Sequence, residues 1–161
     1  MIAIVDNVTW KEGGFPLPTN LSQWHNIKEE ATLLEGTIAK HIIETYVSKY
    51  FNISKLVGFE MWTHNNTRPI GDINEGWHYD KDEYFYKINK VLRFPIFSAV
   101  LYLKIKNLVG GRLVFDDAKV TPKENRLVLF GPGLRHGVEG YSGERVSLNI
   151  NGWNRKLENP I

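Results

Sequence analysis

The 161-residue chain contains no cysteine, and none of its apolar runs is long. The lack of cysteine excludes disulfides, zinc–thiolate sites, iron–sulfur clusters and thiol nucleophiles, so any metal must be held by His, Asp or Glu. No segment approaches the roughly 18 apolar residues of a membrane span, and the apolar N-terminal stretch, residues 1–5, is too short for a signal peptide. We therefore expect a soluble cytoplasmic protein without a membrane partner.

The chain also lacks an excess of charge of either sign. Twenty Lys and Arg residues against eighteen Asp and Glu residues give a net charge of +2, and no basic block is present, so nucleic acid is not an expected partner. Repeats and low-complexity linkers are absent, and the length suits one domain of roughly 100–200 residues. The simplest organisation is a single domain over residues 1–161.

Helical and strand-like patterns occupy different parts of the sequence. Apolar residues at helical spacing predict one or two amphipathic helices within residues 19–52. From about residue 56 to 153, short β-branched and aromatic runs alternate with Gly, Pro, Asn and Asp, which is typical of strands in a sandwich or barrel. The expected strands are residues 57–62, 76–79, 96–105, 112–115, 126–130, 135–138 and 145–151, and residues 81–95 are expected to form a long loop or hairpin.

A histidine and an aspartate stand two positions apart in the expected strand around residue 78. The two-residue period of a strand places His78 and Asp80 on one face. An imidazole and a carboxylate are two parts of the 2-His-1-carboxylate triad that holds non-haem Fe(II). Among the remaining histidines, His136 lies in the strand-rich part of the chain and is the candidate third ligand, whereas His25, His41 and His64 are interpreted as ordinary surface or core histidines.

The last expected strand begins with an arginine, nine residues after His136. Alternation places Arg145, Ser147, Asn149 and Asn151 on one polar face. A buried guanidinium needs an anion, and its geometry suits the far carboxylate of a dicarboxylic cosubstrate. A structural ion pair of Arg145 with Glu139 or Glu144 is the alternative.

These motifs resemble Fe(II)- and 2-oxoglutarate-dependent dioxygenases, especially their prolyl-hydroxylase-like branch. The resemblance rests on His78-x-Asp80, His136 and Arg145, with Gly110-Gly111-x-Leu113 and Leu101-Tyr102-Leu103 between them, and it covers about residues 57–153. It implies a mainly β fold, a double-stranded β-helix of the jelly-roll or cupin-like kind, with N-terminal α-helices supporting one sheet.

The resemblance also implies a function. Fe(II) is bound by His78, Asp80 and His136, and 2-oxoglutarate by Arg145 with help from Tyr102 or Ser147; Tyr102 is equally consistent with an aromatic that fills the barrel. The implied reaction uses O2 to hydroxylate a C–H bond while 2-oxoglutarate yields succinate and CO2, with ascorbate as a reductant in vitro.

The primary substrate remains open between several classes. The resemblance favours a peptidyl prolyl or other amino-acid side chain. The alternatives are a cupin-like module that binds metal without turnover, and an oxygenase of a free small molecule or nucleobase. Cations at the mouth, Lys87, Lys90 and Arg93, would suit an acidic or phosphorylated substrate, whereas the aromatic run at residues 84–86 is interpreted as hairpin packing.

Overall fold

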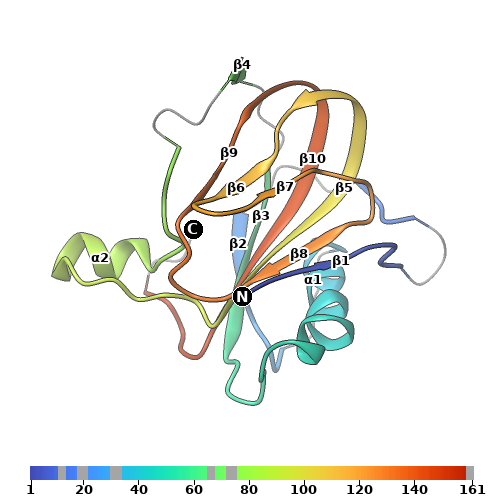
Figure 1. Ribbon diagram of the computed structural model, residues 1–161. Helices are drawn as coiled ribbons and strands as arrows, with labels where there is room; N and C mark the ends of the chain where they lie inside the picture. Colours follow the sequence, from blue (N-terminus) through green and yellow to red (C-terminus); the bar gives the residue numbers. More distant parts are fainter. Residues whose placement is uncertain (11–13, 18–21, 30–33, 65–67, 72–75, 159–161) are drawn as a thin grey trace.

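The computed structural model describes residues 1–10, 14–17, 22–29, 34–64, 68–71 and 76–158, which form two antiparallel sheets and two α-helices (Figure 1). The larger sheet has the strand order β1-β8-β5-β10-β3-β2, with β4 paired to the beginning of β10. Its strands are β1 (Ile2–Val5), β2 (Ser22–Asn26), β3 (Gly58–His64), β4 (Arg68–Gly71), β5 (Phe97–Gly110), β8 (Leu127–Phe130) and β10 (Gly140–Trp153).

The smaller sheet faces the larger one. In the described part of the chain it has the order β7-β6-β9, formed by β6 (Leu113–Phe115), β7 (Lys119–Val120) and β9 (His136–Val138). His78 extends this sheet by a single antiparallel bridge to His136, with each backbone N–H donating to the other residue's carbonyl at 2.9 Å. The two facing sheets form the double-stranded β-helix expected from the sequence.

Strand alternation divides the apolar residues of the larger sheet between two cores. On the outer face, Leu101, Leu129 and Leu148 pack with residues of α1 (Leu34–Thr45), such as Ile42. The inner face contributes Val100, Tyr102, Val128 and Phe130 to a second core with Leu113, Phe115 and Val120 of the smaller sheet. On the same inner face, β10 carries polar residues, and this is the face that borders the cavity described below.

One segment differs from the sequence-based expectation for the N-terminal part. Among the described residues of 19–52, helix is limited to α1 and the 3₁₀ turn Val47–Lys49, while residues 22–26, expected to be helical, form strand β2. In β2, His25 lies opposite Phe59 of β3, and the two rings stack with centroids 5.2 Å apart. Pairing with an available strand edge here outweighs weak helical periodicity, since tertiary context overrides local propensity.

The segment expected to be a loop or hairpin contains a helix instead. Helix α2 (Glu83–Asn89) begins at Asp82, whose side chain accepts a hydrogen bond of 3.0 Å from the Phe85 N–H, and ends at Lys90 in the left-handed conformation. An aspartate followed by an acidic first turn is a helix-start signal. Asp82 and Glu83 carry this signal in the sequence, so the helix has a local origin.

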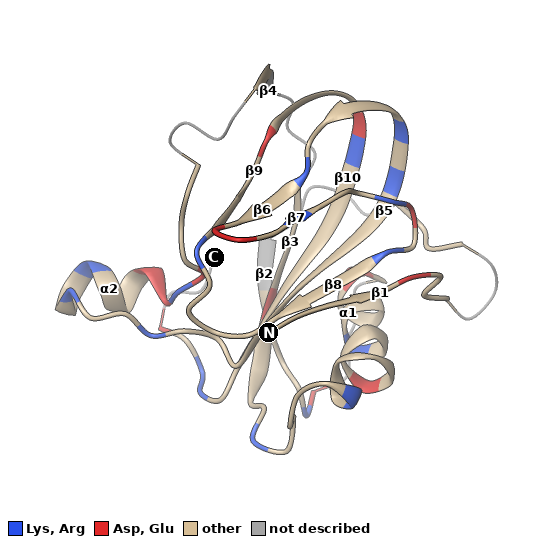
Figure 2. Cartoon of the chain, viewed as in Figure 1, with Lys and Arg blue, Asp and Glu red and all other residues tan. Residues whose placement is uncertain are grey.

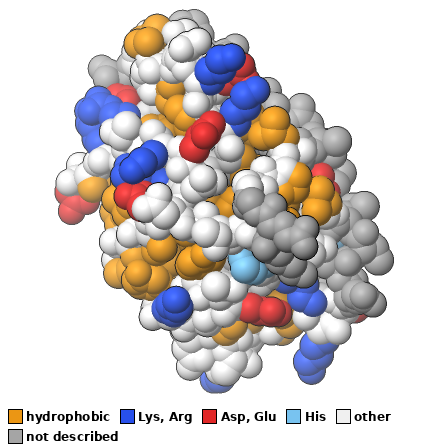
Figure 3. Space-filling view, turned by 90° about the vertical axis from the view of Figure 1, so that its right-hand side faces the viewer, with side chains coloured by type: hydrophobic (Ala, Val, Ile, Leu, Met, Phe, Trp, Pro, Cys, Tyr) orange, Lys and Arg blue, Asp and Glu red, His pale blue; other side chains and the backbone are white. Residues whose placement is uncertain are grey.

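The surface carries charges of both signs. Lysine, arginine and acidic residues are dispersed over the elements in Figure 2 and over the flank in Figure 3, in keeping with the near balance of the composition. Among the described residues, no helix has the length and apolar character needed to cross a bilayer.

Candidate metal centre and adjoining cavity

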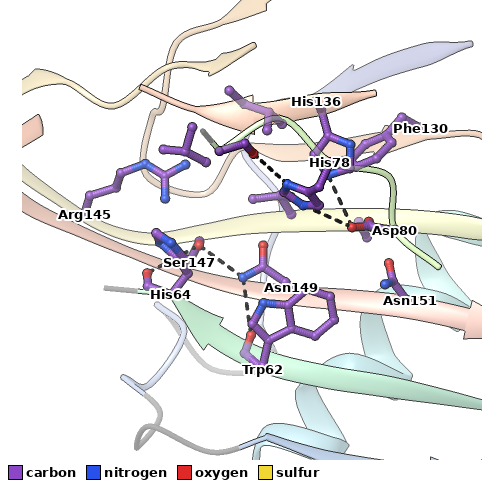
Figure 4. Close-up of a pocket in the computed structure, with 15 residues that line it drawn as sticks. Trp62, His64, His78, Asp80, Phe130, His136, Arg145, Ser147, Asn149 and Asn151 are labelled. Carbon is purple, nitrogen blue, oxygen red and sulfur yellow. Dashed lines mark hydrogen bonds and ion pairs between the residues drawn. The ribbon is translucent and has the colours of Figure 1, made fainter. Parts of the chain in front are cut away.

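The structure brings His78, Asp80 and His136 together between the two sheets (Figure 4). One ligand atom from each residue lies within 4.8 Å of the other two. Asp80 Oδ1 lies 3.5 Å from His78 Nε2 and 3.3 Å from His136 Nε2. The bridge between His78 and His136 explains this convergence, because it fixes both histidine backbones side by side.

Both imidazole rings are oriented by backbone carbonyls. His78 Nδ1 donates to Gly76 O and His136 Nδ1 donates to Leu134 O, each at 2.8 Å. A neutral ring with its proton on Nδ1 presents the Nε2 lone pair, and such carbonyl partners are the usual support of a metal-bound histidine. Phe130 packs edge-on against the His136 ring, with centroids 4.8 Å apart.

The surroundings of Asp80 favour its ionised form. Burial alone raises the pKa of this carboxyl group, but hydrogen bonds from His136 and His78, when these rings also carry a proton on Nε2, and from Ser98 outweigh burial and hold the pKa well below its ordinary value. The hydrogen bond to Asp80 in turn raises the pKa of His78. The site thus combines an anionic ligand with two imidazoles.

This donor set fits a divalent metal ion of the Fe(II) type. With metal–ligand bonds of about 2.1 Å, neighbouring octahedral ligand atoms lie about 3.0 Å apart, close to the distances between Asp80 Oδ1 and the two Nε2 atoms. When both rings are neutral and protonated on Nδ1, their Nε2 lone pairs and the carboxylate oxygen repel one another, and a shared cation removes that repulsion. Nitrogen donors with one carboxylate are the ligand type of non-haem Fe(II) oxygenases.

Arg145 lies at the other end of the cavity and is 2% exposed. Its Nε donates to Gly111 O at 2.9 Å, and its guanidinium carbon lies 5.1 Å from the Tyr102 ring centroid. The ion-pair alternative is wrong for the described residues, because Glu139 binds Arg112 and Glu144 binds Lys104. Among these residues, the buried guanidinium has no acidic partner.

Two neighbours hold Arg145 in place. Tyr102 is fully buried, and its hydroxyl lies 3.5 Å from Arg145 Nη2, although Tyr102 is not among the described residues that line the cavity. Burial raises the pKa of Tyr102 despite the nearby guanidinium, so its hydroxyl stays protonated. Gly111 has φ +77°, and a Cβ there would lie 3.1 Å from Arg145 Cδ, so glycine allows both the turn and the close approach.

The cavity between Arg145 and the histidines has a volume of about 270 Å³. Ser147, Asn149 and Asn151 line it from β10, as the alternation predicted. Asn149 Nδ2 lies 3.5 Å from both Ser147 Oγ and Trp62 O. A polar strand face thus forms one wall of the cavity.

The lining of the cavity differs from the sequence-based expectation in two respects. Trp62 and His64 line the cavity from β3, a position that the sequence interpretation did not assign to either residue; strand alternation within β3 was the available signal. Lys87, Lys90 and Arg93 do not line the cavity, since Lys87 and Lys90 are exposed on or beside α2, which projects from the sheets (Figure 1). The expected cationic mouth is therefore not formed by these residues.

Comparisons with known proteins agree with this architecture. The profile of the 2OG-Fe(II) oxygenase superfamily matches residues 66–155, and a search of curated proteins found no significant match. A Pseudomonas putida prolyl-4-hydroxylase structure is similar with TM-score 0.53 and 22% identity, over 83% of this chain and 72% of that one.

Two further solved structures are similar at lower identity. A 2OG-Fe(II) oxygenase-family oxidoreductase from Burkholderia pseudomallei has TM-score 0.51 and 18% identity, over 76% of this chain and 57% of that one. IDO from Bacillus thuringiensis has TM-score 0.51 and 12% identity, over 84% of this chain and 75% of that one. At these identities the structural matches establish the fold.

The double-stranded β-helix and its cluster of two histidines and one aspartate define the class of metal-dependent oxygenases. Because the family profile matches more than half of the sequence, the chain belongs to the 2OG-Fe(II) oxygenase superfamily. Membership implies Fe(II) as the cofactor and 2-oxoglutarate and O2 as cosubstrates.

Proposed function

We propose that this oxygenase is a hydroxylase in which His78, Asp80 and His136 hold Fe(II) and Arg145 binds the C5 carboxylate of 2-oxoglutarate. The observation that carries the proposal is the pairing of two features in one cavity: three converging metal-ligand atoms and a buried arginine without an acidic partner among the described residues. The first feature suits the metal, and the second suits a dicarboxylate.

Iron bound here would supply dioxygen activation, coupled to conversion of 2-oxoglutarate into succinate and CO2. The protein residues supply geometry and charge. Gly76 and Leu134 carbonyls keep each Nε2 directed at the metal position. Arg145 offers its Nη atoms to the far carboxylate, and Tyr102 is placed to support it or to share that carboxylate. Ser147 adds a hydroxyl to the same wall.

The size of the cavity supports a substrate that inserts only a side chain. A volume of about 270 Å³ lies just below the range of about 300–1,000 Å³ that is typical of ligand pockets, and 2-oxoglutarate would occupy part of it. The remaining space near the histidines suits a small group presented by a larger molecule. We therefore propose a peptidyl prolyl or other amino-acid side chain, which agrees with the fold shared with a prolyl-4-hydroxylase.

The experiment incubates the purified chain with Fe(II), 2-oxoglutarate and ascorbate in air, together with one of three substrate sets. These are proline-containing peptides, the corresponding free amino acids, and nucleosides. The expected result is the gain of one oxygen atom by a peptide, with an equal amount of succinate. His78→Ala abolishes both products, whereas His41→Ala, a matched histidine substitution on α1, leaves them unchanged.

Two outcomes contradict parts of the proposal. Oxidation confined to free amino acids or nucleosides refutes the peptide substrate and leaves the oxygenase. Metal binding without any succinate, in the presence of every substrate set, refutes turnover at this site.

A further inference from the structure

The two carboxylate oxygens of Asp80 lie in different surroundings. Oδ1 faces His78 Nε2 and His136 Nε2, the proposed metal position. Oδ2 accepts a hydrogen bond of 2.8 Å from Ser98 Oγ. With its side-chain amide oriented to donate, Asn151 Nδ2 lies 3.1 Å from the same Oδ2 and 2.8 Å from Ser98 Oγ. One oxygen is therefore left for a metal while the other is occupied by protein donors.

The two donors come from the centre of the larger sheet. Ser98 of β5 and Asn151 of β10 are directly opposite each other in the antiparallel register. Their exposed fractions are 3% and 4%, so water competes little for these hydrogen bonds. Asp80 lies outside the strands, and Figure 4 shows the side chain of Asn151 beside it. A rigid pair of strands thus anchors a ligand carried by a less regular segment.

The hydrogen bonds have a consequence for coordination. A carboxylate binds a cation through one oxygen or through both, and an oxygen that already accepts two hydrogen bonds is a poorer metal ligand. With one oxygen from Asp80 and one nitrogen from each histidine, an octahedral ion keeps three of its six positions for non-protein ligands. A second oxygen from Asp80 would fill one of the three.

We infer that Ser98 and Asn151 are positioning residues that restrict Asp80 to single-oxygen coordination. The inference rests on the proposed metal site. It adds that the hydrogen bonds to Asp80 Oδ2 keep three coordination positions of the metal free for non-protein ligands. Ser98 is the direct donor to Oδ2, and Asn151 both donates to Oδ2 and orients the Ser98 hydroxyl. Without the Ser98 and Asn151 donors, the Asp80 carboxylate can rotate so that Oδ2 also binds the metal. Alternatively, the whole carboxylate can move away from the metal.

The test uses Co(II) as a probe in the absence of turnover. Ser98→Ala removes the hydroxyl that donates to Asp80 Oδ2. Asn151→Leu replaces the side-chain amide with an apolar group of similar size. Metal affinity is measured by competition with a chelator, and the visible absorption of bound Co(II) reports the number and geometry of its ligand atoms. Thermal unfolding without metal shows that each variant is folded.

We expect Ser98→Ala and Asn151→Leu each to weaken Co(II) binding about 10–100-fold, the usual effect of removing support from a metal ligand. We also expect both to change the Co(II) spectrum. Ser98→Thr, which keeps the hydroxyl, restores both properties. The matched control Ser147→Ala, which removes a buried hydroxyl from the same cavity without a contact to Asp80, leaves Co(II) affinity and spectrum unchanged.

The failure of this inference is distinguishable from failure of the proposed function. If folded Ser98→Ala and Asn151→Leu bind Co(II) with the affinity and spectrum of the original chain, the positioning role is refuted and the metal site stands. If the original chain binds Co(II) no better than His78→Ala does, the proposed metal site itself is refuted. If Asn151→Leu does not fold, the comparison of Ser98→Ala with Ser98→Thr decides the inference.

Discussion

Replacement of Arg145 by methionine separates a ligand-binding role of this arginine from a structural one. The guanidinium is 2% exposed and has no acidic partner among the described residues. Methionine keeps an unbranched apolar stem, so much of the packing is retained, and the cost of burying a cation without a counter-ion disappears. We expect the ligand-free protein to change in stability by no more than about 1 kcal/mol. Loss of one member of a buried ion pair would instead cost about 3–5 kcal/mol.

The effect on 2-oxoglutarate binding follows from the lost hydrogen bonds. Two charge-assisted hydrogen bonds to a carboxylate, together contributing about 3 kcal/mol, correspond to about a 100-fold change in Kd. At a concentration 100 times the original Kd, 2-oxoglutarate stabilises the original chain by about 2.7 kcal/mol and Arg145→Met by about 0.4 kcal/mol. For a chain of this size, each kcal/mol raises Tm by about 2–4 °C.

The assay is thermal unfolding with Mn(II), which is stable in air, with and without 2-oxoglutarate. The original chain and Arg126→Met, whose arginine binds Asp6 away from the cavity, should show shifts of about 5–11 °C. Arg145→Met should show a shift of about 1 °C. A full ligand-induced shift in Arg145→Met, or a loss of about 3 kcal/mol in its ligand-free stability, would refute the reasoning.

Three further predictions concern the supports of the site and the metal. Gly111→Ala places a side chain at φ +77° and 3.1 Å from Arg145 Cδ, so we expect a loss of about 1–2 kcal/mol in denaturant unfolding together with weaker 2-oxoglutarate binding; unchanged values for both would contradict the account of this turn. The hydrogen bond from the Arg112 guanidinium lowers the pKa of Glu139 in the folded protein. The stabilisation by the Glu139 carboxylate is therefore complete above the unfolded-state pKa of about 4.3, and it is lost as pH falls through the lower folded-state pKa. Glu139→Gln should therefore lower the free energy of unfolding at pH 7 by about 1 kcal/mol and by less at pH 3, and an equal difference at the two pH values would count against this ion pair. Removal of metal by a chelator should abolish succinate formation, and Fe(II) but not Zn(II) should restore it, because Zn(II) has no redox chemistry; restoration by Zn(II) would speak against an oxidative reaction.

The sequence was most informative where strand alternation and chemical residue type agree. His78 and Asp80 share a two-residue spacing, and the polar face of β10 was correctly assigned to the interior. The convergence with His136 was expected from its place in the strand-rich part of the chain and from the family resemblance, since no local pattern encodes a contact across 58 residues. The alternation of short strand-like runs with turn residues predicted the sandwich or barrel architecture.

Features that depend on tertiary contacts were not predictable in the same way. Strand β2 forms because the edge of β3 is available, and His64 turns into the cavity because β3 lies beside β10. Ser98 stands in an apolar run, and only the register that places it opposite Asn151 reveals its contact with Asp80. The capping signal at Asp82, in contrast, was local and could have predicted α2.

The most direct test of the central claim is formation of succinate from 2-oxoglutarate by the purified chain with Fe(II) and ascorbate in air. The account predicts iron-dependent succinate that disappears in His78→Ala, and in Arg145→Met is recovered only at about 100-fold higher 2-oxoglutarate. No succinate, together with no effect of 2-oxoglutarate on the spectrum of bound Co(II), would contradict the account.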